Sequence, residues 1–200
     1  MLVYWVFPLC IIISSGLALL VSPFWTIVPF AWVLLVVPVI DLVMPKLRET
    51  DNIPPNTLWH NAALIMVVFT VVGLITGGLL EIAENNYSLI DAAILGIAVG
   101  MASGSVGLTA GHELIHKKNS KMRACGIILL LACLYGHFRI EHVSGHHLRV
   151  ATKIDPATAR QGESFYRFFI RCIVMGLFSA WQIESLRLRA KGKFVSHILN

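Results

Sequence analysis

The chain has 200 residues, of which 56% are hydrophobic and only 14% are charged, and its mean hydropathy is +0.75. Soluble globular domains carry about 25% charged residues, so this composition excludes an ordinary soluble domain and indicates an integral membrane protein. The formal net charge is +5 at pH 7. Attraction to a membrane surface accounts for that charge without nucleic acid as a partner.

Four apolar segments precede the first histidine motif. Each has about the 17 to 25 residues that a helix needs to cross the hydrocarbon core. The predicted membrane-spanning helices cover about residues 2–21, 24–44, 59–80 and 88–110. The first segment lacks the basic start of a signal peptide and a second apolar segment follows it directly, so we expect it to be retained. Residues 48–56 contain two adjacent prolines and predict a loop.

Basic residues are distributed unevenly along the chain. Two of the 16 Lys and Arg residues follow the second apolar segment, and the other fourteen lie between Lys117 and Lys193. The charged residues of the link at residues 81–91 are all acidic. By the positive-inside rule, this link faces outward and the residues after Gly111 face the cytoplasm. The four cysteines form no CxxC pair and are predicted to be small buried hydrophobes.

The first histidine motif is "HELIH", at residues 112–116. His112 and His116 are four residues apart, so on a helix they share one face and can bind one cation together. Taken alone, this is the zinc-protease pattern, with Glu113 as the general base.

The second motif, "EHVSGHH" at residues 141–147, repeats this spacing with His142 and His146. An α-helix would turn His147 about 100° away from His146. Five convergent histidines exceed the three protein ligands typical of a catalytic zinc, so two metal ions fit better. Imidazole suits iron, copper, nickel and zinc alike, so the histidines alone leave the metal open.

The other polar residues near the motifs have less direct predicted roles. Glu113 and Glu141 could be metal ligands or proton carriers, and we expect them to accept hydrogen bonds that fix histidine tautomers. We expect His137 to support the site or to pack beside it without binding metal. His60 and His197 are predicted to be hydrogen-bonded or snorkelling residues at the membrane interface and not ligands.

Two further apolar segments follow the first motif. Residues 124–135 would form a helix of roughly 18 Å, too short to cross a bilayer, and predict a re-entrant, interfacial or buried helix. Residues 163–190 predict an interfacial helix, because Arg167 and Arg171 stand four residues apart among aromatic side chains. The sequence therefore predicts one all-α, multi-pass integral-membrane domain over residues 1–200, with its histidine region at residues 111–160.

Longer stretches around the motifs resemble a known family. "GHELIHKK", "YGHFRIEH" and "HHLRVATKIDPATARQGESFYRF" are similar to the membrane-bound alkane 1-monooxygenases, bacterial hydroxylases of the integral-membrane desaturase and hydroxylase superfamily. The family pattern has a HExxHK box, an EHxxGHH box and, directly after it, the phrase "VAT..DPA..R.GES.Y.F". That phrase runs over residues 150–168 here. The similarity also includes "VPVIDLVMP" at residues 37–45, so it covers most of the chain.

The resemblance implies an enzyme of the bacterial inner (cytoplasmic) membrane whose two non-haem iron ions use O2 to hydroxylate the terminal carbon of medium-chain n-alkanes. Electrons would come from rubredoxin, which an NAD(P)H-dependent rubredoxin reductase reduces. The implied iron ligands are His112, His116, His142, His146 and His147. A basic surface of residues 117–123 with Arg149, Lys153 and Arg160 is the expected dock for the electron carrier.

The family also has a third histidine box, which we expect after Asn200. The chain is therefore expected to be a C-terminally truncated piece that is inactive alone. Three alternatives stay open: a related hydroxylase of alkyl aromatics such as xylene, a membrane HExxH zinc protease, and a metal transporter. A transporter would need polar groups within several crossings, and the first three have almost none.

Overall fold

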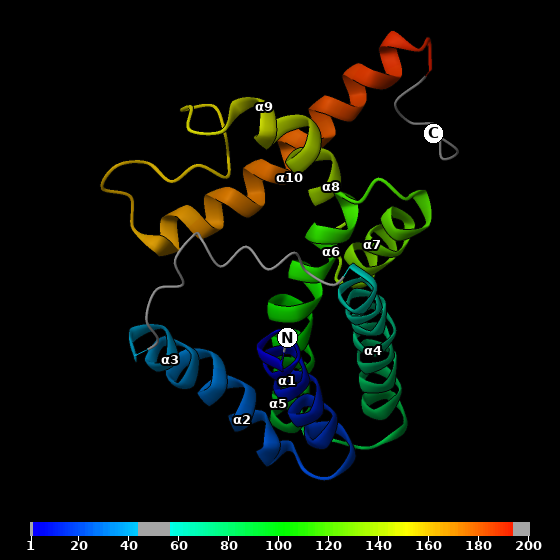
Figure 1. Cartoon of the computed structure of the whole chain (residues 1–200), viewed down its shortest axis with the longest axis vertical. Coiled ribbons are helices and arrows are strands. Elements are labelled where there is room, and N and C mark those ends of the chain that lie inside the picture. Colours follow the sequence, from blue (N-terminus) through cyan, green and yellow to red (C-terminus); the bar gives the residue numbers. More distant parts are fainter. Residues whose placement is uncertain (1, 44–56, 194–200) are drawn as a thin grey trace. The chain divides into compact units, whose positions relative to one another are not determined.

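The structure, a computed structural model, describes residues 2–43 and 57–193. Every regular element in these residues is a helix (Figure 1), which confirms the all-α prediction. The predicted loop at residues 48–56 and His197 lie outside the described residues. The chain divides into two compact units, Met1–Cys133 and Leu134–Asn200, and each is described by itself below.

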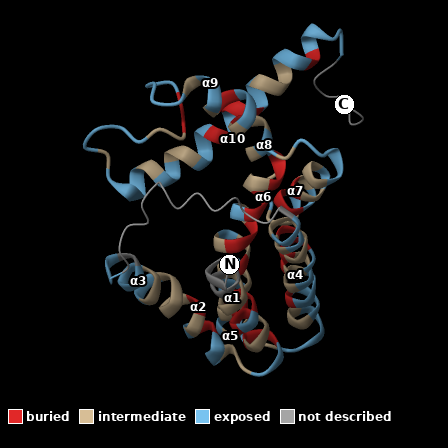
Figure 2. Ribbon diagram, in the orientation of Figure 1, coloured by how far each residue is buried: buried red, intermediate tan, exposed pale blue. Residues whose placement is uncertain are grey.

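The first unit is built from long apolar helices. In it, α1 (Leu2–Leu20) packs against α4 (Thr57–Glu84) and α5 (Leu89–Ala102). Between α1 and α4 the chain forms four short helical segments: η1 (Pro23–Thr26), α2 (Ile27–Ala31), the π-helical turn η2 (Trp32–Val36) and α3 (Val37–Val43). Figure 2 shows buried positions on α4 and along α5, with exposed positions on their other faces. The core of the unit includes Ile11, Val71 and Leu114, each 0% exposed.

Four helical stretches are long and apolar enough to cross a membrane: Pro23–Ile40, Leu58–Glu84, Leu89–Ile115 and Phe165–Ala190. The first three overlap predicted crossings. The apolar part of α1, Pro8–Leu20, is shorter. The fourth stretch was predicted to lie in the interface; its length and composition also allow it to cross, so its placement stays a prediction.

One continuous helix carries the first histidine motif. It consists of α5, the π-helical turn η3 (Ser103–Gly107) and α6 (Leu108–Ile115). In η3 the backbone N–H of Leu108 donates to the carbonyl of Ser103, five residues back, which is the π-helical pattern. The helix runs five residues past its predicted end at residue 110. The motif therefore lies on a membrane helix itself and not on a loop after it.

A short helix, α7 (Ser120–Ala132), packs against α6. It begins at Asn119, whose side chain accepts hydrogen bonds from two backbone N–H groups of the first turn. The two helices meet at Gly126, where a Cβ atom would lie 2.7 Å from the Cβ of Leu114 and 3.1 Å from the carbonyl oxygen of Gly111. This close approach holds the helix of the first motif firmly. At 13 residues, α7 has the short length predicted for this segment.

The second unit carries the second motif. Its helical segments are α8 (Phe138–Glu141), the π-helical turn η4 (His142–His146), α9 (His147–Arg149) and α10 (Phe165–Ala190). A loop of residues 150–164 joins α9 to α10. The side chain of Ser164 caps α10, which packs against α8 and η4. The side chain of Arg171, predicted to belong to an interfacial helix face, is only 14% exposed and binds the loop.

Candidate metal centre

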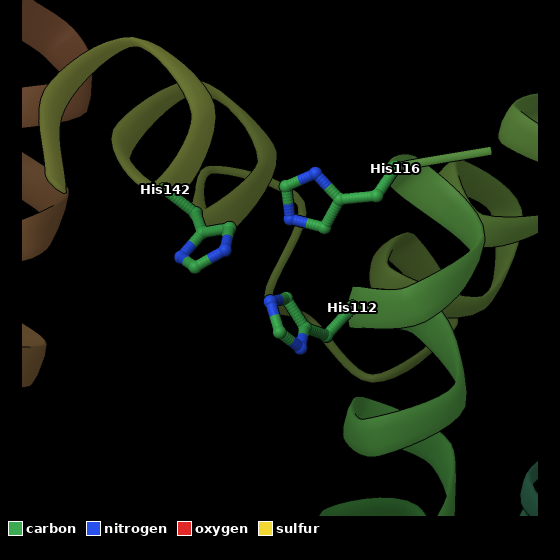
Figure 3. Close-up of side chains that lie close together, drawn as sticks. All are labelled: His112, His116 and His142. Carbon is green, nitrogen blue, oxygen red and sulfur yellow. The ribbon is translucent and has the colours of Figure 1, made fainter. Parts of the chain in front are cut away.

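The first motif presents two imidazole rings from one helix face. His112 and His116 lie on consecutive turns of α6, and their ring centroids are 5.0 Å apart. Figure 3 shows both rings leaving the same side of the helix. This is the arrangement predicted from the four-residue spacing. A helix face of this kind can offer two nitrogen ligands to one cation or one ligand to each of two.

The glutamate of the first motif is held by two cationic or polar neighbours. Glu113 Oε1 lies 2.8 Å from Lys117 Nζ and 2.5 Å from His60 Nε2. His60 is on α4, so this hydrogen bond ties α4 to α6. The hydrogen-bonded role predicted for His60 is therefore confirmed, and its partner is the central glutamate of "HELIH". Glu113 accepts hydrogen bonds as expected, although not from a predicted ligand.

The second motif is wound differently from the α-helix that its spacing suggests. In η4 the backbone N–H of His147 donates to the carbonyl of His142, five residues back. A π-helical turn therefore aligns positions five apart. The rings of His142 and His147 have centroids 4.4 Å apart and their Nε2 atoms are 3.1 Å apart. The centroids of His142 and His146 are farther apart, at 5.4 Å. The neighbouring of His142 and His146 expected from the spacing is thus present, and the π-helical turn adds a closer approach of His147 to His142.

A buried aspartate holds the remaining histidine of the motif. His146 Nδ1 lies 2.8 Å from Asp155 Oδ2, and the Asp155 side chain is 0% exposed. Asp155 also accepts hydrogen bonds from the backbone N–H of Ala157 and the hydroxyl of Thr158. Burial raises the pKa of Asp155, but the hydrogen bonds from Thr158, Ala157 and His146 outweigh it, and the pKa is lowered overall. An ionised carboxylate at Nδ1 favours the tautomer that leaves Nε2 free to bind a metal ion.

The glutamate of the second motif is paired with an arginine. Arg149 donates to both carboxylate oxygens of Glu141, at 2.9 and 3.1 Å, and to the hydroxyl of Ser179 on α10, at 2.7 Å. The Glu141 side chain is 7% exposed. Gly145 is needed here because a Cβ atom would lie 2.3 Å from Arg149 Nη2 and 2.5 Å from Glu141 Oε2. This explains the glycine of "EHVSGHH". It also shows that Arg149, predicted to lie on a docking surface, pairs internally.

His137 lies beside the second motif, in contact with Tyr135. Its ring stands edge-on to that of Tyr135, with centroids 4.6 Å apart. Both residues line a small cavity of about 40 Å³ that His142 and His146 also line. Burial lowers the pKa of His137, and the nearby Glu141 offsets this only in part. A neutral ring at this position is consistent with the supporting role predicted for His137.

An apolar cavity of about 210 Å³ lies within the first unit. Its wall consists of residues of α4, residues of the continuous helix formed by η3 and α6, and Pro8 of α1. The α4 side contributes His60, Ala63, Leu64 and Val67, and the other helix contributes Ser105, Val106, Thr109, Ala110 and Glu113. The hydroxyls of Ser105 and Thr109 are bonded to carbonyls of their own helix. Of the residues in this wall, only His60 and Glu113 are titratable, and they are hydrogen-bonded to each other.

Comparison with known proteins identifies the family. The family model described as "Fatty acid desaturase" matches residues 90–198, which is more than half of the chain. The chain belongs to the fatty acid desaturase family. The matched residues include both histidine motifs, the loop with Asp155, and α10.

The alkane 1-monooxygenase of Ectopseudomonas oleovorans is 44% identical over 157 residues, which are 76% of this chain and 36% of the relative. Alkane 1-monooxygenase 1 of Pseudomonas aeruginosa is 34% identical over 163 residues, 78% of this chain and 42% of the relative. The hydroxylase component of a xylene/toluene monooxygenase of Pseudomonas putida is 29% identical over 162 residues, 78% of this chain and 42% of the relative. These relatives confirm the resemblance seen in the motifs. The chain spans less than half the length of these three relatives.

Sequence reasoning did not single out three residues of this desaturase-family site. They are Asp155, Ser179 and, as the partner of Glu141, Arg149. Each is placed by a contact between residues nine, thirty or eight positions apart in the sequence. The only signal for Asp155 in the sequence was its position in the phrase "DPA" that follows the second motif. That signal marked the family and not the role.

Proposed function

We propose that the protein is a membrane-bound non-haem di-iron monooxygenase that converts medium-chain n-alkanes to 1-alkanols. The reaction balances as alkane, O2, two electrons and two protons giving 1-alkanol and water. Rubredoxin supplies the electrons and is itself reduced by an NAD(P)H-dependent rubredoxin reductase. Family membership and the alkane 1-monooxygenase relatives support this proposal.

The observation that carries the proposal is the 3.1 Å separation of the Nε2 atoms of His142 and His147. Two imidazole nitrogens that bind one ion at about 2.0–2.1 Å on neighbouring coordination positions lie about 3 Å apart. This pair therefore fits one ion. Asp155 holds Nδ1 of His146, so His146 would bind iron through its other ring nitrogen, Nε2.

His112 and His116, whose ring centroids are 5.0 Å apart, would also bind iron. Bound iron would supply O2 activation, chemistry that side chains alone do not perform. The residues of the chain hold the ligands in position. Asp155 fixes the tautomer of His146. The hydrogen bond between His60 and Glu113 joins α4 to the helix that carries His112 and His116. The apolar cavity beside that hydrogen bond has the chemistry to hold an alkyl chain and to exclude water.

A zinc protease fits the contacts of Glu113 less well. That mechanism needs the carboxylate of the HExxH motif to act as a base on a metal-bound water. Here one oxygen of Glu113 is engaged by Lys117 and His60. A transporter is also disfavoured, because most of the residues that line the cavity of the first unit are apolar. We place the protein in the bacterial inner membrane with the histidine motifs on the cytoplasmic side, where Lys153 and Arg160 are exposed to an electron carrier.

The test is iron analysis of the full-length protein, which includes the histidine box expected after Asn200, combined with an assay of octane and ¹⁸O2 in the presence of rubredoxin and its reductase. We expect about two iron ions per chain and one ¹⁸O atom in 1-octanol. Substituting His147→Gln should remove iron and product, whereas His137→Gln should retain iron. A single-zinc enzyme would tolerate the loss of His147. Iron-free protein, or product without ¹⁸O, would refute the proposal.

An alkyl aromatic substrate is the second candidate, and the xylene/toluene monooxygenase relative favours it. The chemistry would be the same and the difference would lie in the shape of the cavity. Octane and xylene supplied at equal concentration to the same membranes separate the two. A higher kcat/KM for octane supports the alkane, and the reverse ratio assigns the protein to the alkyl aromatics.

A further inference from the structure

Arg171 makes an unusually complete set of contacts for a residue of a predicted interfacial helix. Its Nε and Nη2 atoms donate to the two carboxylate oxygens of Glu163, at 2.7 and 2.6 Å. Its Nη1 donates to the carbonyl of Pro156 and its Nη2 to the carbonyl of Thr158, both at 3.0 Å. The Glu163 side chain is 4% exposed. One guanidinium on α10 thus holds the loop of residues 150–164 at three points.

Two of these contacts lie next to the groups that hold the Asp155 carboxylate. The carbonyls of Pro156 and Thr158 flank Ala157, whose N–H donates to Asp155 Oδ1 at 3.0 Å. The hydroxyl of Thr158 donates to Asp155 Oδ2 and accepts from the N–H of Ala151. Arg171 therefore fixes the backbone on both sides of the groups that hold the Asp155 carboxylate.

The backbone at the start of the loop shows how closely it is constrained. Ala151 has φ = 64°, in the left-handed region that residues with a Cβ atom rarely adopt. Such a conformation persists only where the surroundings determine it. Its N–H bond to Thr158 is one such determinant, and Thr158 is in turn held by Arg171.

We propose that Arg171 is a positioning residue for His146. It touches neither metal nor substrate; it sets the place of the Asp155 carboxylate, and this carboxylate sets the orientation and tautomer of the His146 ring. The inference rests on the proposed function in that His146 is taken to bind iron. Lysine should not replace Arg171, because a single ammonium cannot span a carboxylate and two carbonyls as the planar guanidinium does.

The experiment uses the whole protein in lipid nanodiscs, labelled with ¹⁵N-histidine, and the variants Arg171→Lys and Arg167→Lys. Arg167 is exposed and lies one turn earlier on α10, so it is the matched control. The tautomer of His146 is read by NMR in the metal-free protein, with its signal assigned by His146→Gln. Ferrous iron is then titrated, and the ⁵⁷Fe Mössbauer spectrum is recorded. Glu163→Gln is the second variant, in case Arg171→Lys does not insert.

In the parent protein and in Arg167→Lys we expect His146 to be wholly the Nδ1–H tautomer. In Arg171→Lys we expect a mixture of tautomers, an altered Mössbauer spectrum and iron affinity about 10- to 100-fold weaker, the usual effect of losing a contact behind a ligand. An unchanged tautomer overturns the inference. A changed tautomer with unchanged iron affinity and spectrum also overturns it, because the state of His146 that Arg171 sets would then have no effect on iron binding. If the parent binds no iron but the tautomer shifts as expected, the proposed function fails and the link from Arg171 to His146 stands.

Discussion

Substituting Gly145→Ala tests how the second histidine motif is built. The added Cβ atom would lie 2.3 Å from Arg149 Nη2 and 2.5 Å from Glu141 Oε2. Contacts under 3.0 Å cannot persist, so the Arg149 guanidinium or the Glu141 carboxylate must shift, and we expect their ion pair to break. The carboxylate of Glu141 is 7% exposed and would lose its cationic partner.

The expected loss of stability follows from this geometry. Breaking a fully buried ion pair by removing one partner costs about 3–5 kcal/mol. Arg149 is 26% exposed and can find water after it moves. Water screens part of the loss, so we expect about 2–3 kcal/mol.

The assay is unfolding of the purified protein in detergent, followed by tryptophan fluorescence. The matched control is Gly176→Ala on α10, because a Cβ atom there meets nothing within 4 Å. That control should be neutral or gain up to about 1 kcal/mol from helix propensity. Equal stability of the two alanine variants would refute the steric explanation. In an Arg149→Met background, Gly145→Ala should cost much less than in the parent.

Three further predictions concern other contacts. Hydrogen bonds from Arg171 and from the backbone N–H of Arg160 lower the pKa of Glu163 from 4.5 to about 2. The stability that this contact contributes is therefore complete above pH 4.5 and is lost as the pH falls toward 2. Glu163→Gln should flatten the dependence of the unfolding temperature on pH over that window. Gly126→Ala forces α6 and α7 apart and should destabilise the protein by about 1–3 kcal/mol in the same unfolding assay; an unchanged unfolding temperature would contradict the close crossing. His60→Ala should lower the free energy of unfolding by at most about 1 kcal/mol, because its carboxylate partner Glu113 is 41% exposed. The same variant should lower the iron content of the protein. His60→Gln should restore the iron content, because the glutamine side chain is again a hydrogen-bond donor.

The predictability of each histidine motif depended on its local winding. The spacing of His112 and His116 was sufficient, because α6 is an ordinary α-helix there. For the second motif the same spacing was incomplete: the rings of His142 and His146 do stack, 5.4 Å apart, but η4 adds one residue to the turn and brings His147 still closer to His142. A π-helical turn depends on which carbonyl each N–H finds once the segment is packed. The residue types of the motif do not specify that choice.

The arginines and acidic residues around the second motif show the same limit. Arg149 and Arg171 were interpreted as surface charges, since isolated basic residues on a membrane protein usually face water or lipid headgroups. Each instead pairs with a carboxylate of low exposure eight residues away. A long charged side chain has many possible partners, and the loop of residues 150–164 decides among them. That loop has no periodicity from which its path could be predicted.

The sequence by itself determined the membrane class, the all-α fold and the family, because hydropathy, helical periodicity and extended motifs are local properties of the chain. It also supplied the five histidines proposed as ligands. Only the tertiary structure decided that Asp155 holds His146, that His60 on α4 reaches Glu113 on α6, and that Gly145 makes room for Arg149. The physical reason is that these contacts need two segments to approach within hydrogen-bonding distance. Backbone winding and packing set that distance, and composition and spacing do not contain it.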